Sequence, residues 1–280
     1  MSEGLPRVSV IMPVLDAGRD LGEALRSVAA QTRTDHELVI VDDGSTDPAT
    51  LTLLEEAAGR PGVTVHRTPN RGPAAARNLA VEHARGAYLL PLDADDYLAP
   101  TFLERTVPIL DADAGVGVVH TWVGLVGEHH GTWRTGPFAI PELLSRCTVH
   151  VTSLFRREIW TEAGGYDVRF VDGSEDWDLW LAAAARGWRG HCVPDVLAWY
   201  RRSPRSRERL ARRPGVSRHR MQTLVAKHRA LYEQHLEDAL GALYEELMQA
   251  STSLERVYHH PAVRLVLGVR DALGRAKPRA

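Results

Sequence analysis

The sequence has few cysteines, no long hydrophobic segment and no signal-peptide pattern. Only Cys147 and Cys192 occur, and they are not in a metal-ligand spacing, so we expect reduced core residues and neither a disulfide nor a zinc site. No run of about 18 apolar residues is present, which predicts no membrane-spanning helix. Residues 1–6 are polar and the next apolar stretch is typical of a strand, so the expected location is the cytoplasm.

A strong charge of either sign is also lacking. The formal net charge is −2, so no basic field favours nucleic acid as a partner. Hydrophobic residues make up 44% and charged residues 25% of the chain, which is typical of a globular protein. A length of 280 residues allows one large domain, with or without an appendage.

Strand and helix patterns alternate through residues 1–97. Short β-branched runs indicate buried strands at residues 8–14, 38–41, 63–66 and 87–92. Apolar residues at helical spacing indicate helices between them, at residues 21–29, 48–58 and 73–84. This alternation predicts an α/β fold with a mixed, mostly parallel sheet flanked by helices.

Two acidic clusters follow strands of this sheet. Asp42-Asp43 follows the second strand, and Asp93-Ala94-Asp95-Asp96 follows the fourth. Both should lie beyond the carboxyl ends of the strands, where such sheets bind ligands. Two carboxylates separated by one residue offer hard oxygen ligands for Mg²⁺ or Mn²⁺, and a diphosphate is a natural further ligand. The alternative is that both clusters are ordinary polar turns that begin helices.

The pattern is less regular in the second half of the sheet. Further strands are expected at residues 116–126 and 151–156, with two more within 188–200, and short helices at 142–147 and 175–186. These elements would complete the same sheet. A third acidic group, Glu175-Asp176 with Asp178, begins the helix at 175–186.

A C-terminal helical extension is expected beyond the sheet. Apolar residues at helical spacing run through 221–258. The predicted domains are therefore residues 1–215, with halves 1–97 and 98–215, and an extension at 216–280. The extension is a candidate homodimer interface. Its basic end, residues 261–280, fits either a helix packed on the domain or a helix lying at the inner surface of a membrane.

Five motifs in this order resemble glycosyltransferase family 2, whose members have the GT-A fold. They are VSVIMPVLDAGRDL, ELVIVDDGSTD, NRGPAAARN, YLLPLDADDYL and GGYD with GSEDWDLWL. The resemblance covers about residues 7–202, and its specificity lies in the order and gaps of the motifs. It implies a metal-dependent enzyme that moves a sugar from a nucleotide-diphosphate sugar, most often UDP-linked, to a saccharide, lipid-linked or other hydroxyl acceptor.

The resemblance also implies residues of the nucleotide site, in the half at 1–97. Asp43 would contact the base, and Pro13 and Val14 would line the nucleoside pocket. Arg77 would support the same site. Asp93 would lie close to the nucleotide as the first acid of the Asp-x-Asp motif.

Metal and catalytic roles are implied for the remaining acids. Asp95 would be the more direct ligand of Mn²⁺ or Mg²⁺, with Asp93 beside it. Of the pair Glu175-Asp176, Asp176 would be the general base of an inverting transfer. A helix dipole lowers the pKa of such an acid, whereas like charges at Glu175 and Asp178 raise it, and the sequence leaves the balance open. It also leaves open whether Glu175 or Asp178 shares the role, or whether all three merely begin a helix.

A basic segment follows the last expected strand. Arg201 and Arg202, together with Arg205 and Arg207, are candidate contacts of the diphosphate. The alternative is a solvated basic linker into the helical extension.

Other functions fit parts of the pattern. A nucleotidyltransferase uses a similar sheet and similar acids, but it would carry a glycine-rich, lysine-bearing phosphate loop where this chain has PVLDAGRDL. A nucleotide-sugar binder without catalysis is disfavoured because every acid needed is present. The Glu175-Asp176 pair disfavours transfer with retention.

Overall fold

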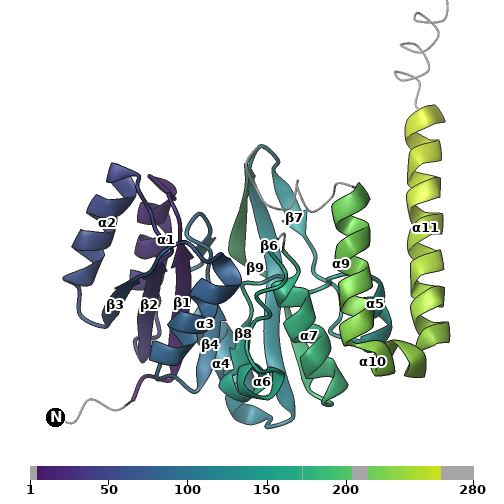
Figure 1. Cartoon of the computed structure of the whole chain (residues 1–280), viewed down its shortest axis with the longest axis horizontal. Helices are drawn as coiled ribbons and strands as arrows, with labels where there is room; N and C mark the ends of the chain where they lie inside the picture. Colours follow the sequence, from purple (N-terminus) through teal and green to yellow (C-terminus); the bar gives the residue numbers. More distant parts are fainter. Residues whose placement is uncertain (1–4, 172, 204–213, 260–280) are drawn as a thin grey trace, which may run out of the picture. The chain divides into compact units, whose positions relative to one another are not determined.

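The structure is a computed structural model, and it describes residues 5–171, 173–203 and 214–259. The chain divides into two compact units, Met1–Gln234 and His235–Ala280. The first unit contains the entire described sheet, and the second contains helix α11 (Leu236–His259). Figure 1 labels these elements along the chain.

The first half of the sheet is parallel. Strands β1 (Val8–Val14), β2 (His36–Asp42), β3 (Val63–Arg67) and β4 (Tyr88–Pro91) stand in the order β3-β2-β1-β4. Three helices connect them, α1 (Asp20–Ala29), α2 (Pro48–Ala58) and α3 (Pro73–His83). Residues on both faces of β1 are buried, as expected for a strand covered by helices on both sides.

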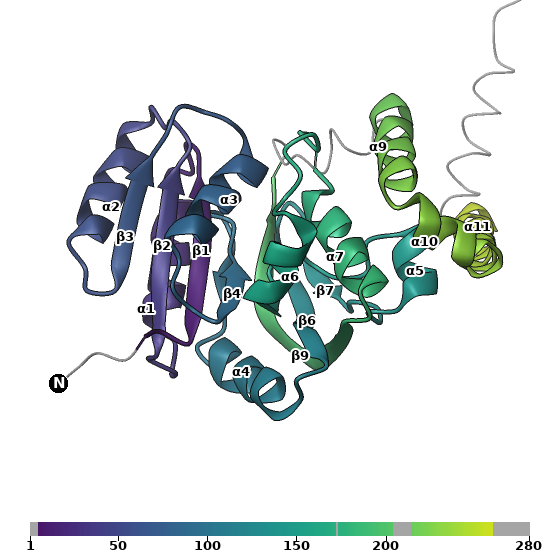
Figure 2. The ribbon, with the colours of Figure 1, turned by 60° about the horizontal axis from the view of Figure 1, so that its bottom comes forward.

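The second half mixes parallel and antiparallel pairs. It contains β5 (Tyr97–Leu98), α4 (Phe102–Ala112), β6 (Val116–Gly127), β7 (Gly131–Trp133), α5 (Ile140–Ser145), β8 (Leu154–Arg156), α6 (Arg157–Ala163), α7 (Glu175–Ala185) and β9 (Arg189–Arg202). The short β8 joins the halves through antiparallel pairing with β4 and β6. Helices α3, α6 and α7 lie on the same side of the sheet (Figure 2). The mixed α/β sheet flanked by helices is confirmed.

One strand differs from its prediction. Two strands were expected within residues 188–200, where Pro194-Asp195 has the composition of a turn. They belong instead to the single long strand β9, which pairs with β6. The register passes from Thr121↔Val193 to Trp122↔Val196, so Pro194 and Asp195 form an irregularity within the strand. Proline fits there because a bulge leaves an amide unpaired.

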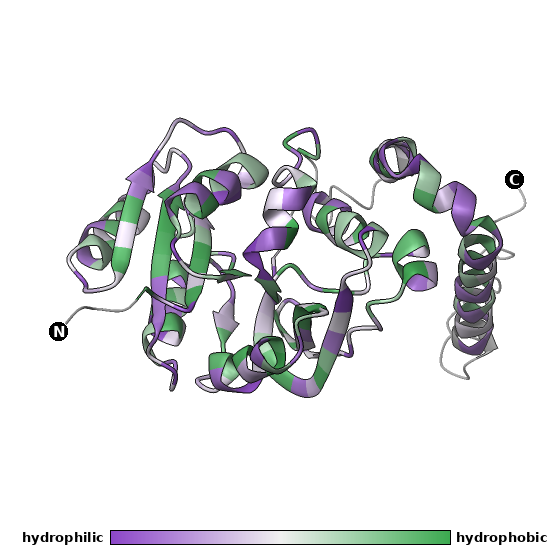
Figure 3. Cartoon of the chain, turned by 90° about the horizontal axis from the view of Figure 1, so that it is seen from below, coloured by the Kyte–Doolittle hydropathy of each residue, from purple (hydrophilic) through white to green (hydrophobic). Residues whose placement is uncertain are grey.

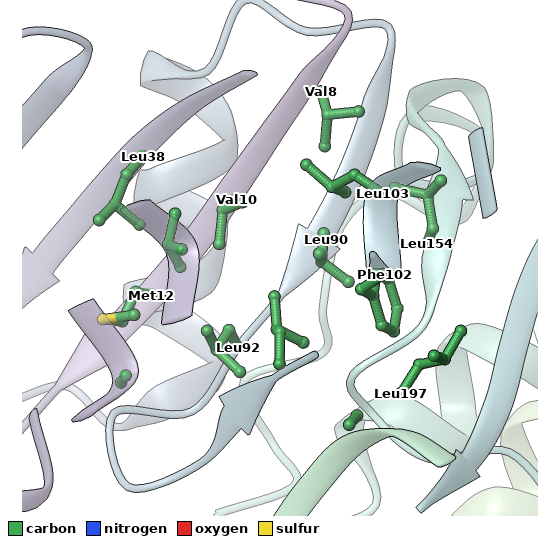
Figure 4. Packing of buried hydrophobic residues seen from close by; sticks show 14 of the residues in the cluster. Val8, Val10, Met12, Leu38, Leu90, Leu92, Phe102, Leu103, Leu154 and Leu197 are labelled. Carbon is green, nitrogen blue, oxygen red and sulfur yellow. The ribbon is translucent and has the colours of Figure 1, made fainter. Parts of the chain in front are cut away.

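A continuous apolar core holds the two halves of the sheet together. Val10 and Met12 of β1 belong to this core together with Leu90 and Leu92 around β4 and with Phe102 of α4, which lies next to Leu90 (Figure 4). All five side chains are fully buried. The strands are accordingly among the most hydrophobic segments, while the helices carry both kinds of residue (Figure 3). This rigid layer fixes where the loops at the carboxyl ends of the strands begin.

The first compact unit ends at Gln234, whereas the sequence predicted a domain boundary at residue 215. Helices α9 (Pro214–Lys227) and α10 (Arg229–Gln234) belong to the first unit. Leu224 of α9 is fully buried, and Tyr232 of α10 donates a hydrogen bond to the Leu144 carbonyl oxygen, 2.9 Å away. Helical periodicity alone does not reveal which helices pack on the sheet domain, and the domain boundary at residue 215 stays a prediction.

Helix α11 is the described part of the second unit. The homodimer predicted for the extension stays a prediction, and the basic residues 261–280 lie outside the described residues, as do Arg205 and Arg207. Among the residues that the structure covers, no helix is both long enough and apolar enough to pass through a bilayer.

Candidate functional site

Arg77 is the residue around which the acidic motifs meet. One guanidinium nitrogen donates to Asp93 Oδ1 at 2.5 Å, and another donates to Glu175 Oε1 at 2.6 Å. Asp93 follows β4 in the first half of the sheet, and Glu175 begins α7 in the second. The ion pairs therefore join the Asp-x-Asp segment to the Glu-Asp segment through Arg77, which lies 98 residues before Glu175.

Helix α3 places Arg77 in this position. The helix starts after Gly72, whose φ of +86° suits glycine, and Pro73 occupies its first turn. Small residues dominate the helix, and Ala74 and Ala80 are buried beside Arg77. They leave room for a long side chain that is itself only 1% exposed.

The charge of Arg77 depends on its two partners. Burial by itself lowers the pKa of the guanidinium, but the carboxylates of Asp93 and Glu175 outweigh it and raise that pKa above its ordinary value. Tyr166 lies against the other side, with its ring 5.7 Å from the guanidinium carbon. A buried charge that is paired with two carboxylates fixes the relative positions of the segments that carry those carboxylates.

Asp43 binds the backbone that precedes the N-terminal end of α3. Its two carboxylate oxygens accept the backbone N–H groups of Arg71 and Gly72, each at 2.8 Å. Asp43 is 3% exposed, and its own N–H donates to the Val14 carbonyl oxygen. The residue predicted to bind the base thus also fixes the start of the helix that carries Arg77.

The residues predicted to line the nucleoside pocket end strand β1. Val14 has a buried side chain within the apolar core, so its backbone and not its side chain reaches Asp43. Pro13 is half-buried. Beyond them Asp16, with φ +46°, accepts the N–H groups of Thr46 and Asp47. Asp16 was not predicted, although its place in the first motif was a signal for it.

The Asp-x-Asp segment concentrates negative charge in a mostly buried turn. Burial, and then the charge of Asp93, raise the pKa of Asp95 to about 6. Burial, and then the charges of Asp95 and Asp93, raise the pKa of Asp96 well above its usual range. Asp96 accepts the Arg201 N–H at 2.8 Å, but its Oδ2 is buried without a hydrogen-bond partner among the described residues. A cation near this turn would offset the repulsion.

These acids fit one kind of metal site. No group of three or more His, Cys, Asp and Glu side chains within the described part of the chain could hold a metal ion. Asp93 and Asp95 offer two carboxylates, a number that suits an ion completed by phosphates and water, as is usual for Mg²⁺.

The predicted diphosphate contacts lie next to this turn. Arg201 donates from Nε to the Asp95 carbonyl oxygen at 2.9 Å, and its guanidinium forms an ion pair with Glu23 of α1. Arg201 is thus engaged in holding the turn to α1. The guanidinium of Arg202 lies over the ring of Tyr200, 5.9 Å from its centre.

The three acids of α7 have different surroundings. Glu175 is 3% exposed and paired with Arg77, and Asp178 is 2% exposed and bound to Lys227 and His228. Asp176 is less buried, and its Oδ1 accepts the Trp177 N–H at 2.8 Å. Asp176 is therefore the most exposed of the three acids.

Asn78 ties α3 to the loop before α7. Its Oδ1 accepts the Tyr166 N–H and the Trp160 indole N–H, and its amide nitrogen donates to the Tyr166 carbonyl oxygen. Gly165, with φ +88°, leaves no space for a side chain, since an added Cβ would lie 2.9 Å from Asn78 Oδ1. Asn78 is the last residue of the motif NRGPAAARN, but the sequence pattern implied no role for it.

Comparison with protein families gives a match over much of this region. The model of the family described as Glycosyl transferase family 2 matches residues 9–165. EpsE of Bacillus subtilis (strain 168) is 32% identical over 202 residues, which cover 69% of this chain and 72% of that protein. A chondroitin synthase of Escherichia coli is 28% identical over 65% of this chain, and the match spans only 27% of that protein's length.

Solved structures share the fold. S. aureus TarS 1-349 in complex with UDP-GlcNAc superposes with a TM-score of 0.68 at 20% identity, covering 79% of this chain and 66% of that one. The mannosyltransferase PcManGT from Pyrobaculum calidifontis, in complex with GDP-Man and Mn²⁺, gives a TM-score of 0.58 at 24% identity. It covers 98% of this chain and 82% of that chain.

Proposed function

Because this chain belongs to glycosyltransferase family 2, we propose that it transfers a sugar from a nucleotide-diphosphate sugar to a hydroxyl acceptor, with a divalent metal ion and with inversion. The observation that carries the proposal is the buried Arg77, which joins Asp93 to Glu175. This pairing brings together the two segments that carry Asp95 and Asp176. A donor between them would meet a metal-binding acid and a base.

The donor side is assigned to the first half of the sheet. Asp43 and the end of β1, with Pro13 and Val14, would hold the nucleoside, and Arg77 supports this side through Asp93. A bound Mn²⁺ or Mg²⁺ on Asp95 would neutralise charge on the diphosphate as it leaves. Arg201 and Arg202 are the proposed contacts of the diphosphate, and the guanidinium of Arg201 is also paired with Glu23.

The chemical step is assigned to Asp176. Its carboxylate takes the proton of the acceptor hydroxyl while the acceptor oxygen bonds to the anomeric carbon and the bond to the diphosphate oxygen breaks. Glu175 keeps Arg77 in place, and Asp178 is occupied by Lys227 and His228, so neither shares the role of base. Attack opposite the leaving group inverts the anomeric carbon.

The donor and acceptor are proposed only as classes. UDP-linked sugars are favoured by the family, and TarS and PcManGT are solved with UDP-GlcNAc and GDP-Man respectively. Relatives named as chondroitin and hyaluronan synthases support a saccharide acceptor, although the chain spans less than a third of their length. We place the reaction in the cytoplasm. The nucleotidyltransferase alternative loses its support because the family is now established.

The test is hydrolysis of nucleotide sugars, in which water replaces the acceptor. UDP-GlcNAc and GDP-mannose are each incubated with the protein and Mn²⁺, and then with a chelator. We expect hydrolysis of at least one, lost with the chelator. Asp176→Asn should bind the donor normally but hydrolyse it about 10²- to 10⁴-fold more slowly. Asp195→Asn, which changes an exposed acid paired with Arg105, is the control. Normal hydrolysis by Asp176→Asn would refute the assigned base.

A further inference from the structure

The residue before α7 has an unusual backbone. Ser174 has φ +81°, a left-handed conformation that a residue with a Cβ rarely adopts and that persists only where its surroundings hold it. Its side chain does not cap α7. Instead its hydroxyl accepts a hydrogen bond from the guanidinium of Arg220 on α9. The chain therefore enters α7 through a turn that is held from a distant helix.

The end of α9 and the residue that follows it also contact the first turn of α7. Lys227 Nζ donates to Asp178 Oδ2 at 2.7 Å, and His228 Nε2 lies 2.8 Å from Asp178 Oδ1. Lys227 also donates to Asp167 Oδ2 at 2.8 Å, in the loop that follows α6. Asp178 and His228 are both buried, so these contacts are shielded from water.

Ser174 and Asp178 flank Asp176 at equal separation, two residues on each side. Helices α9 and α7 lie side by side in both views (Figures 1 and 2). The buried Leu224 anchors α9, and the bond from Tyr232 to Leu144 anchors α10. The position of the Asp176 backbone is thus set from a segment outside the five motifs that identify the family.

We infer that Arg220 and Lys227 of α9, with the adjacent His228, are positioning residues that hold the first turn of α7 so that the Asp176 carboxylate meets the acceptor hydroxyl. The inference rests on the proposed function of Asp176. Asp43 and Asp95 are held by other elements, so loosening α9 should slow the chemical step and leave nucleotide binding intact. A general loss of structure would instead weaken both.

The test compares charge-removing variants on the full chain. Arg220→Met and Lys227→Met remove contacts to α7, whereas Arg229→Met removes an exposed arginine that pairs only loosely with Glu233, at 3.7 Å within α10. The readouts are kcat for nucleotide-sugar hydrolysis with Mn²⁺ and the dissociation constant of UDP from tryptophan fluorescence. We expect kcat to fall about 10-fold or more in the first two variants, with UDP affinity within about 2-fold of wild type. Arg229→Met should match wild type, and Arg220→Lys should recover part of kcat.

Hydrogen exchange of residues 175–181 gives a readout that needs no activity. Exchange should be faster in Arg220→Met and Lys227→Met and unchanged in Arg229→Met. Unchanged exchange in the first two variants would overturn the inference, as would a loss of kcat accompanied by an equal loss of UDP affinity.

Asp176→Asn, assayed in parallel, separates the two claims. If it is inactive while Arg220→Met and Lys227→Met keep a normal kcat, only the role of α9 is wrong. If Asp176→Asn is fully active, the assigned base is wrong and the role of α9 falls with it. Loss of kcat in all three variants supports both.

Discussion

Removing Arg77 should destabilise the protein more than removing any exposed arginine. In Arg77→Met the apolar part of the side chain is largely kept, but the buried Glu175 carboxylate loses its ion pair with Arg77. Glu175 is 3% exposed and Asp93 is 27% exposed, so most of the penalty comes from Glu175. Breaking a buried pair by removing one partner typically costs about 3–5 kcal/mol, and we expect a loss in that range.

The magnitude is checked by urea unfolding, followed by tryptophan fluorescence and far-UV circular dichroism. With a slope near the upper end for small proteins, about 3 kcal/mol per M, the loss moves the midpoint by roughly 1 M or more. Arg105→Met is the matched control, because Arg105 and Asp195 form an ion pair in which both side chains are 49% exposed. Such a pair contributes about 0–1 kcal/mol, so the control should unfold close to wild type.

A double variant tests the cause of the loss. Arg77→Met with Glu175→Gln removes the stranded charge, and we expect it to recover at least about 1 kcal/mol relative to Arg77→Met alone. The reasoning is refuted if Arg77→Met is no less stable than Arg105→Met. It is also refuted if the double variant is less stable than Arg77→Met, because the stranded charge would then not be the source of the loss.

Two further predictions concern stability elsewhere in the sheet domain. Burial lowers the pKa of His120 to about 4, from an ordinary 6.5, so His120 of the unfolded chain takes up a proton before His120 of the folded chain as pH falls. The neutral, buried His120 therefore contributes to stability fully above pH 6.5. This contribution, about 3 kcal/mol, is lost as pH falls towards 4. His120 lies within hydrogen-bond distance of the Thr135 hydroxyl, which an asparagine can also reach. In His120→Asn, the free energy of unfolding measured from pH 7 to 4 should therefore fall less steeply than in wild type. Equal slopes would contradict the lowered pKa of His120. Gly165→Ala places a Cβ 2.9 Å from Asn78, whereas Gly164→Ala, at a similar φ, meets nothing within 4 Å. Thermal unfolding should therefore show Gly165→Ala less stable than Gly164→Ala by about 1–3 kcal/mol, and equal stabilities would rule out the contact.

Much of the sheet could be predicted because local patterns determined it. The expected strand at residues 8–14 coincides with β1, and the expected helix at 73–84 differs from α3 by one residue. These segments combine a strong apolar pattern with clear ends, such as Gly72-Pro73 before α3. The prediction for 188–200 was wrong because a bulge and a turn share the same local composition at Pro194-Asp195.

The partners of the site residues could not be predicted in the same way. Arg77 was expected to support the nucleotide site, but its bond to Glu175 spans 98 residues and exists only once β4, α3 and α7 are packed together. The same holds for Asp178, which was considered as a second base and instead binds Lys227, 49 residues later. A sequence pattern shows which residues are acidic but not which of them are already neutralised by a distant cation.

Binding of UDP in the presence and absence of Mn²⁺ tests the central claim most directly. Calorimetric titrations of wild type, Asp95→Ala and Asp195→Ala are carried out with Mn²⁺ and with a chelator. They separate the effect of the metal ion on UDP affinity from the effect of the substituted side chain. We predict that chelation weakens wild-type binding at least 10-fold, or about 1.4 kcal/mol, that Asp95→Ala with Mn²⁺ shows the same loss, and that Asp195→Ala behaves as wild type. Equal affinity of wild type and Asp95→Ala, with or without Mn²⁺, would contradict a metal-dependent donor site at this turn.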